Sequence, residues 1–276
     1  MSPRSPWWRL LSEPRSLLGV ALVALVLLAA LLGPVLSGLD PAAPDFAATL
    51  SAPAAPHPLG TDDLGRDVLA RILEGARVSL LVGLGSVGLA LLVGAPLGLV
   101  AGYAGGWTDG LLMRCMDVLL AFPGILLALG ITAALGASLP VTVAAIALVN
   151  LPVLARVARA EALALRMRDF VQAERALGFG PTTILVRSVG PNALSPILVQ
   201  ASVLLASSVI TESYLSFLGL GVQPPTPSWG NMLHDAVGFL DQAVWLAVFP
   251  GLAIFLTVLG FNLLGDALRD RLDPND

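Results

Sequence analysis

Residues 156–196 read RVARAEALALRMRDFVQAERALGFGPTTILVRSVGPNALSP, the longest polar, charge-bearing stretch of an otherwise apolar chain. Good helix formers dominate 158–177, and apolar residues recur there at spacings of three and four, which predicts a helix with one apolar face. Gly178 is expected to end this helix, and a second short apolar run over 182–189 is expected to end at Gly190-Pro191. The pattern indicates an ordered loop that docks onto another surface.

The composition places most of the chain in a membrane. Of the 276 residues, 56% are hydrophobic and 12% are charged, and the mean hydropathy is +0.85. An ordinary soluble domain carries about 25% charged residues, so most of this chain cannot face water. The length allows several apolar spans of about 20 residues each, with the stretch 156–196 as a loop between two of them.

Six apolar segments are long enough to cross a membrane, so the predicted fold class is an all-α integral membrane protein with six transmembrane helices. The first, at 17–36, has a competing interpretation as the apolar region of a secretory signal peptide. A retained span is favoured, because the run is long for such a region and the following GLDPAAPDF lacks a small-residue cleavage pattern. The spans are expected at 17–36, 78–101, 111–135, 139–157, 193–220 and 244–264.

The segment 37–77, between the first two spans, is predicted to be a polar loop. Its first half is rich in proline and alanine and is typical of a solvated spacer. In its second half, over 62–74, apolar residues recur at helical spacing, which predicts a short amphipathic helix on the membrane surface or against a partner. The remaining five spans and their connections occupy 78–266.

The arginines orient the chain in the membrane. With six spans, the termini at 1–16 and 267–276 share a side with the loop 158–192, and cytoplasmic segments are enriched in basic residues. The opposite side carries only Arg66, Arg71 and Arg77. We therefore expect both termini and the loop to be cytoplasmic and the segment 37–77 to be extracytoplasmic. The arginines on the cytoplasmic side are Arg4, Arg9, Arg15, Arg114, Arg156, Arg159, Arg166, Arg168, Arg175, Arg187, Arg269 and Arg271.

No residue pattern predicts an enzyme. His57 and His234 are far apart in the sequence, Cys115 is the single cysteine, and the chain has no lysine. A cysteine-based metal site and the lysine-containing phosphate loop of ATP-binding proteins are therefore excluded. No catalytic residue, metal ligand, cofactor or nucleic-acid partner is expected.

Polar residues inside spans are costly in lipid, so they are candidates for a functional role. Asp117 lies one turn from Arg114, and an interfacial pair between them is favoured over a role in transport. Asn150, close to a proline, is expected to mark a kink where its amide satisfies freed backbone groups. Glu212, beside Ser213, is expected either to line a watery cavity or to bond to a partner subunit.

Three glycines in the second span recur at every fourth position. Gly94, Gly98 and Gly102 place small residues on one helix face, which allows a neighbouring helix to approach closely in lipid. Packing within the fold is favoured over self-association.

The stretch FVQAERALG at 170–178, followed by PNA at 191–193, resembles the EAA loop of permease subunits of bacterial ABC importers. Further segments resemble the inner-membrane permeases for dipeptides, oligopeptides and nickel. They are HPLGTDDLGRDVLARILEGARVSLLVG at 57–83, MDVLLAFPGILLA at 116–128, ITESYLSFLGLGVQPPTPSWGNML at 210–233 and FPGLAIFLTVLGFNLLGDALRDRLDP at 249–274. The resemblance covers nearly the whole chain after the first span.

The resemblance implies the type I ABC importer transmembrane fold and a function as half of a translocation pathway in a bacterial inner membrane. It also implies a second homologous permease, two cytoplasmic ATP-binding subunits and an extracytoplasmic solute-binding protein as partners. A short coupling helix, over about 178–187, would sit in a groove of an ATPase. The coupling residues implied are Gln172, Ala173, Glu174, Ala176, Leu177, Gly178, Pro181, Arg187 and Pro191.

The chain departs from the family pattern at two places in this loop. The family usually starts the loop with Glu-Ala-Ala, whereas this chain has Gln172-Ala173-Glu174, so the acid lies two positions further along. Gly190 stands where the family usually has leucine. A salt bridge of the family's glutamate is therefore not carried over to this chain.

The alternative hypothesis is a secondary transporter or channel that acts alone. Such proteins often contain inverted repeats and ion sites on broken helices. The sequence shows no duplicated half and few acids within spans, which favours the importer subunit. The solute stays open among dipeptides, longer peptides, nickel chelates and glutathione.

Overall fold

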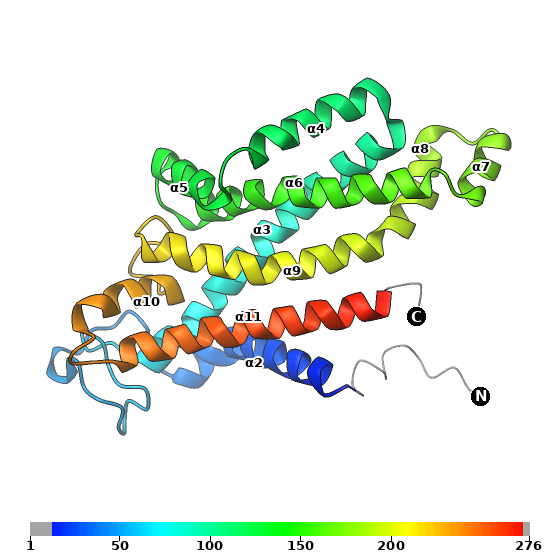
Figure 1. Cartoon of the computed structure of the whole chain (residues 1–276). Helices are drawn as coiled ribbons and strands as arrows, with labels where there is room; N and C mark the ends of the chain where they lie inside the picture. The colour runs from blue at the N-terminus through cyan, green and yellow to red at the C-terminus, as the bar shows by residue number, and fades with distance from the viewer. Residues whose placement is uncertain (1–12, 273–276) are drawn as a thin grey trace, which may run out of the picture.

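The computed structural model describes residues 13–272 as a bundle of long helices (Figure 1). The sequence-based expectations for 1–12 and 273–276 lie outside the described residues. Two short 3-10 turns, η1 (Phe46–Ala48) and η3 (Val237–Phe239), and one π-helical turn, η2 (Leu185–Val189), connect the helices. The helices are α2 (Pro14–Ser37), α3 (Val68–Ala104), α4 (Gly106–Leu120), α5 (Gly124–Leu135), α6 (Leu139–Leu165), α7 (Asp169–Ala176), α8 (Pro181–Ile184), α9 (Gly190–Phe217), α10 (Trp229–Ala236) and α11 (Trp245–Leu272).

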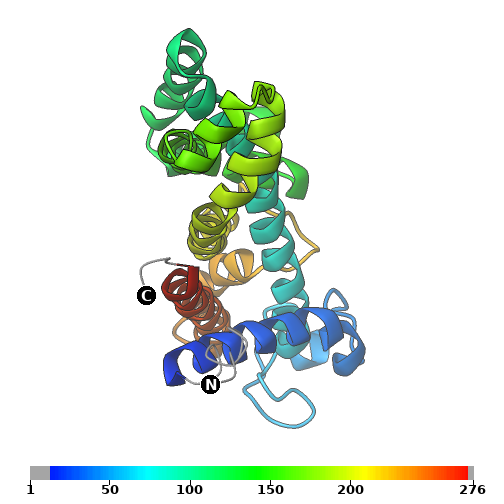
Figure 2. The same cartoon turned by 90° about the vertical axis from the view of Figure 1, so that its right-hand side faces the viewer.

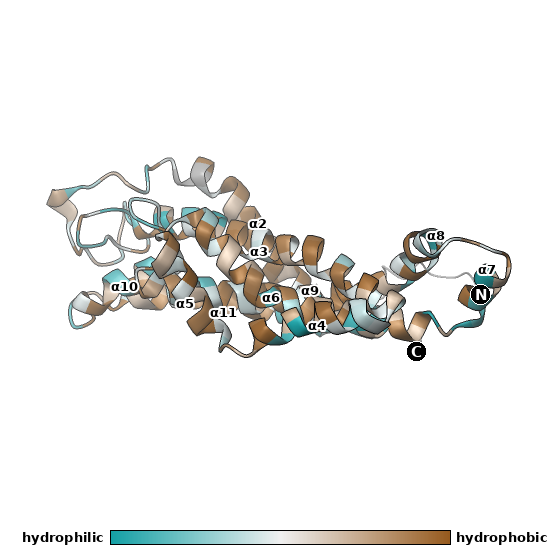
Figure 3. Ribbon diagram, turned by 90° about the horizontal axis from the view of Figure 1, so that it is seen from above, coloured by the Kyte–Doolittle hydropathy of each residue, from teal (hydrophilic) through white to brown (hydrophobic). Residues whose placement is uncertain are grey.

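The molecule has two distinct ends. Helices α7 and α8 lie at one, and α10 with the segment 38–67 lies at the other (Figure 1). Apolar residues dominate the long helices between them, and polar residues concentrate toward the ends (Figure 3). We call the two ends the α7 end and the α10 end. This distribution is the one expected of helices that cross a membrane.

The predicted all-α fold with six spans is confirmed. Within the described residues, five helices are long and apolar enough to cross a membrane, and α4 with α5 makes a sixth if this bent pair counts as one span. The span predicted at 111–135 is bent, because α4 and α5 meet at an angle of 83°. Pro123 explains the bend, since proline disfavours helical geometry in the residue before it and removes a backbone donor.

The predicted amphipathic helix over 62–74 is also wrong. Residues 62–66 form a turn in which the Asp62 carboxylate accepts hydrogen bonds from the backbone N–H groups of Leu64 (3.0 Å) and Arg66 (2.9 Å). Asp67 then caps α3 by accepting from Ala70 N–H at 2.8 Å. The residues after it form the first turns of α3, which continues unbroken to Ala104. At 1.5 Å per residue this helix is about 55 Å long, well beyond a hydrocarbon core of about 30 Å.

The predicted glycine packing within the fold is confirmed. Helix α3 lies directly against α6, and a β-carbon at Gly94 would come within 2.7 Å of the Leu151 carbonyl oxygen. Added β-carbons at Gly98 and Gly102 would collide with the backbone of α6 in the same way. The absence of side chains at these three positions lets the two backbones touch.

Helix α2 packs along α11 and against α3 (Figure 2). Small residues again set the distance, because a β-carbon at Gly19 would lie 2.8 Å from Leu263 Cβ and one at Gly260 would lie 2.9 Å from Leu22 Cβ. Beyond Arg15, the opposite face of α2 exposes a series of leucines and carries no charge.

Candidate functional site

The loop between the fourth and fifth spans is ordered, as predicted, but its first helix is broken. Helix α6 ends at Leu165 and α7 begins at Asp169, so the single helix expected over 158–177 is wrong. The turn between them is held by Gln172, whose Nε2 donates to the Arg166 carbonyl oxygen at 3.0 Å. The turn lets Val171 fold back into a buried cluster, which a straight helix would not allow.

The predicted glycine stop at residue 178 is confirmed. Gly178 has φ 84°, in the left-handed region that favours glycine. Its N–H bonds to the Arg175 carbonyl (3.0 Å), and the Phe179 N–H bonds to the Glu174 carbonyl (3.1 Å). This pair of bonds is a Schellman motif, which satisfies the last carbonyls of α7. A β-carbon at this position would meet no atom within 4 Å, so backbone conformation and not space requires the glycine.

The predicted second stop, at Gly190-Pro191, is wrong. From Pro181 the chain is helical through α8, the π turn η2 and α9 up to Phe217. Proline at position 191 is tolerated because it lies in the first turn of α9, and the wider π turn precedes it. The expected short coupling helix over 178–187 is therefore the first part of one long helical element.

Contacts from three directions hold the loop against the bundle. Ser188 Oγ donates to Glu174 Oε1 at 2.6 Å and so ties η2 to α7. The Arg175 guanidinium lies 5.2 Å from the ring centroid of Tyr103, at the end of α3. Beneath these contacts a buried cluster joins α6, α7, α8 and η2. Its members are Ala162, Val171, Ile184 and Val189.

The outer surface of the same loop is apolar. Leu177 is 77% exposed and Val186 is 66% exposed, although both are large aliphatic residues. Phe179 is also exposed and borders an open groove of about 310 Å³ together with Tyr103 and Arg175. All the coupling residues implied by the resemblance lie on this loop, and all are exposed except Glu174, which is half-buried.

Asp117 does not pair with Arg114, so that expectation is wrong. Asp117 Oδ1 accepts a hydrogen bond from Arg156 Nη2 of α6 at 2.8 Å, and both side chains are about half exposed. A second pair joins the same two helices, where Arg159 binds Asp109 through two hydrogen bonds of 2.5 and 2.8 Å. The partners lie on different helices because α4 packs against α6, which no local spacing reveals.

Asn150 and Glu212 also differ from expectation. Asn150 Nδ2 donates to Ser208 Oγ of α9 at 2.8 Å, and so it joins two helices instead of repairing a kink. Glu212 is completely buried in this chain and accepts from Ser216 (2.7 Å) and from Ser79 of α3 (3.2 Å). Glu212 therefore neither lines a cavity nor is exposed for contact with another subunit. Ser213 Oγ donates to the Val209 carbonyl at 2.9 Å.

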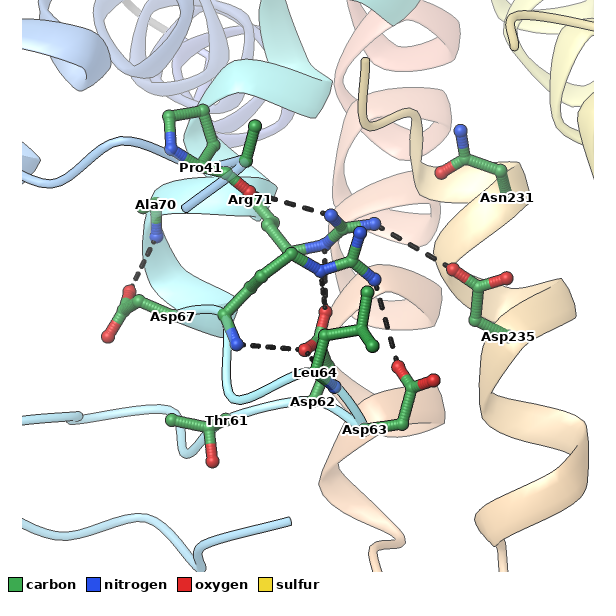
Figure 4. A network of polar contacts seen from close by, with 12 residues as sticks. Pro41, Thr61, Asp62, Asp63, Leu64, Asp67, Ala70, Arg71, Asn231 and Asp235 are labelled. Carbon is green, nitrogen blue, oxygen red and sulfur yellow. Dashed lines mark hydrogen bonds and ion pairs between the residues drawn. The ribbon is translucent and has the colours of Figure 1, made fainter. Parts of the chain in front are cut away.

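A polar network at the α10 end was not predicted (Figure 4). Arg66 Nε lies 2.7 Å from Asp62 Oδ2, and Arg71 Nε lies 3.4 Å from the same oxygen. Arg71 also reaches Asp235 of α10 at 3.8 Å and the Pro41 carbonyl at 3.5 Å. Burial raises the pKa of Asp235, and the nearby Arg71 opposes that rise. The close run of acids and arginines over 62–71 was the available signal, but the predicted amphipathic helix rested on the apolar residues of this stretch alone.

The segment 38–67 is anchored by further contacts. His57 Nδ1 lies 2.8 Å from Asp67 Oδ2, and Trp245 Nε1 donates to the Thr61 carbonyl at 3.3 Å. Trp229 of α10 is 1% exposed and donates from Nε1 to the Ile72 carbonyl of α3 at 3.0 Å. The loop is therefore a folded part of the protein and not a spacer.

The family of binding-protein-dependent transport system inner membrane components matches residues 94–275. The chain belongs to this family. The described features fit, since the match covers the α3–α6 packing, the ordered loop and both following spans. The resemblance seen in the loop sequence is thereby confirmed, and so is the function of a permease subunit in a binding-protein-dependent importer.

Named relatives cover almost the whole chain. The dipeptide transport system permease protein DppC of Alkalihalophilus pseudofirmus is 43% identical over 98% of this chain and 90% of its own length. The di/tripeptide transport system permease protein DppC of Pseudomonas aeruginosa is 44% identical over 99% and 92%. The glutathione transport system permease protein GsiD of Pectobacterium atrosepticum is 48% identical over 80% and 74%.

A solved structure shares the fold. The MetNI methionine ABC transporter, in inward-facing conformations, superposes with a TM-score of 0.61 at 16% identity, covering 72% of this chain and 95% of the matched chain. At this identity the likeness supports the type I importer transmembrane fold alone.

Proposed function

We propose that the chain is a peptide-importing permease whose loop 158–192 couples the spans to a cytoplasmic ATPase. The observation that carries the proposal is the exposed apolar surface around the Gly178 turn. Leu177 and Val186 lie exposed at the α7 end, where large aliphatic side chains gain nothing from contact with water. A protein partner that buries them recovers the hydrophobic free energy that exposure forfeits.

The way the loop is held suits the transmission of force. The Glu174–Ser188 hydrogen bond and the buried cluster below it fix α7 to η2. Because the chain is helical without interruption from Pro181 to Phe217, a push on α8 displaces α9 as a unit. ATP-driven approach of two ATPase subunits would thus reach the spans through this element.

The arginines support the proposed orientation. The α7 end carries the loop arginines, among them Arg168 and Arg187, and the positive-inside rule favours a cytoplasmic location for such an end. The α10 end would then face outward and receive the solute-binding protein. A second homologous permease would complete the pathway, and two ATP-binding subunits would supply the hydrolysis, so this chain alone would hydrolyse no ATP.

Peptides are the solute class that the relatives support, since their names specify dipeptide, di/tripeptide and glutathione transport. Nickel stays an untested alternative. A transporter or channel acting alone is not supported, because the family consists of components of binding-protein-dependent systems.

The test replaces Gly178 by arginine in the complete transporter reconstituted in proteoliposomes. A side chain at φ 84° strains the turn, and a large charged one occupies the docking surface, so ATP-driven uptake of a dipeptide should fall to background while membrane insertion stays normal. Gly180→Arg adds the same side chain to the same exposed loop at φ −68°, which any residue adopts, so its uptake reports the effect of bulk and charge without strain in the turn. Uptake and ATPase association that survive Gly178→Arg would rule out the coupling assignment.

A further inference from the structure

Two ion pairs join α4 to α6, and they differ in how completely their groups are used. Arg159 holds Asp109 with two parallel hydrogen bonds, and the Asp109 side chain is 16% exposed. Arg156 holds Asp117 with one hydrogen bond, and the two side chains are 54% and 46% exposed. The second pair therefore keeps one carboxylate oxygen and most of the guanidinium N–H groups available to a ligand.

The Asp117–Arg156 pair lies well inside the helices. Asp117 is eleven residues after Gly106, the first residue of α4, which corresponds to a rise of about 16 Å. An aspartate side chain is too short to reach an interface from that depth, and a half-exposed charge against hydrocarbon is costly. The face of α4 and α6 that carries this pair therefore borders water or polar groups and not lipid.

Helix α2 shows what a lipid face of this chain looks like. Leu25 is 56% exposed and lies eleven residues after Pro14, at the same rise along its helix as Asp117 along α4. Its exposed neighbours are leucines, and no charged residue lies between Arg15 and Asp40. Arg114, by contrast, adds a further exposed charge to α4. The two exposed surfaces face different media.

We propose that Asp117 and Arg156 line the solute path and bind the charged ends of a zwitterionic solute, the ammonium at Asp117 and the carboxylate at Arg156. A free peptide carries both groups, and each meets an oppositely charged partner with unused hydrogen-bonding capacity. Binding exchanges the single hydrogen bond of the pair for bonds to the solute, so the site opens and closes without leaving a charge unpaired. This assignment rests on the proposed function in peptide import.

The first experiment tests the placement of the pair. In a Cys115→Ser background, which removes the only thiol, Asp117→Cys and Leu25→Cys are labelled with a membrane-impermeant maleimide in the assembled transporter. Cys115→Ala serves as the background if the serine variant assembles poorly. The residue at 117 should react at least about tenfold faster than the one at 25, because the proposal places it beside water and Leu25 beside lipid. Equal rates would overturn the placement.

The second experiment tests the chemistry of recognition by uptake of a dipeptide, its N-acetyl form and its C-terminal amide. Arg156→Gln should raise KM about tenfold for solutes with a free carboxylate and leave that for the amide unchanged. Asp117→Asn should do the same for solutes with a free ammonium and spare the acetylated form. Asp109→Asn and Arg159→Gln are matched controls, which should change transport of all three solutes by one common factor.

The outcomes separate this inference from the proposed function. If the Asp117 and Arg156 variants change KM by the same factor for all three solutes, the pair only holds α4 against α6. If the wild-type complex imports no dipeptide at all, the peptide assignment fails, and recognition of peptide ends by this pair fails with it. Labelling at 117 without dipeptide still decides whether this face borders the aqueous path.

Discussion

The two ends of the molecule differ in what their surfaces leave unpaired. At the α10 end, charged side chains such as Asp62 and Arg71 are buried and paired, and a long-range hydrogen bond from Trp245 ties the loop to α11. At the α7 end, Leu177 and Val186 are exposed above a well-braced base. The first end is completed by its own chain, whereas the second leaves an apolar surface for another protein. Substitutions at the α10 end should therefore destabilise the fold, and those at the α7 end should impair coupling.

The largest effect on stability is expected from Trp229→Ala. The indole is 1% exposed and its N–H bonds to the Ile72 carbonyl, so removing it leaves a cavity and loses this hydrogen bond. We expect a loss of about 3–5 kcal/mol in the free energy of unfolding, measured by denaturant titration in detergent micelles. Trp107→Ala is the control, because Trp107 is 81% exposed. Equal losses in both variants would contradict the contrast between buried and exposed tryptophans.

A smaller loss is expected from Arg71→Met. The side chain of Arg71 is 4% exposed and touches Asp62 and Asp235, but Asp62 keeps Arg66 as a partner. We expect a loss of about 1–3 kcal/mol by the same titration. Arg77→Met, at an exposed position one and a half turns further along α3, should change stability by less than about 0.5 kcal/mol. If Arg71→Met leaves the free energy of unfolding unchanged, the network does not stabilise the α10 end.

The smallest effect on stability is expected from Leu177→Ser, which should change the unfolding free energy by less than about 0.5 kcal/mol. Affinity for the ATPase should fall about tenfold or more, because a docked leucine contributes about 1.5–3 kcal/mol. Titration of purified ATPase subunits against the permease in nanodiscs measures this. Phe46→Ser, which is 72% exposed at the α10 end, should leave the affinity unchanged. An equal loss of ATPase affinity in both variants would contradict the proposed difference between the two ends.

Hydropathy was sufficient to predict the spans, because long apolar runs have few alternatives in a membrane. Hydropathy does not report the direction of a helix. The 83° bend at Pro123 was therefore not visible in the apolar run that contains it. The Gly178 stop was predictable because it depends on local backbone conformation. Gly190-Pro191 has similar local chemistry, yet the helix passes through it, since Pro191 falls in the first turn of α9.

The polar partners could not be predicted, because they are set by helix packing and not by spacing. Asn150 bonds to Ser208, Arg156 bonds to Asp117, and Glu212 bonds to Ser79 from a different helix. The expectations had looked to nearby groups in sequence for Asp117 and Asn150, and to a cavity or a partner subunit for Glu212. In a bundle, the nearest group in space lies on a neighbouring helix, and the glycine faces that choose the neighbours say nothing about individual polar pairs.

The π turn η2 has a geometric consequence for the element it interrupts. The Gly190 N–H bonds to the Leu185 carbonyl five residues back, so this turn holds one residue more than an α-turn. An α-helix advances about 100° per residue, and the extra residue therefore offsets the angular phase of α9 from that of α8 by that amount. Helices α8 and α9 therefore form one continuous element whose two parts differ in angular phase. Deleting Ser188 or Val189 would remove this offset and turn Ala193 and Ile197 away from α3 and α6, while Val186 and Arg187 stay in place.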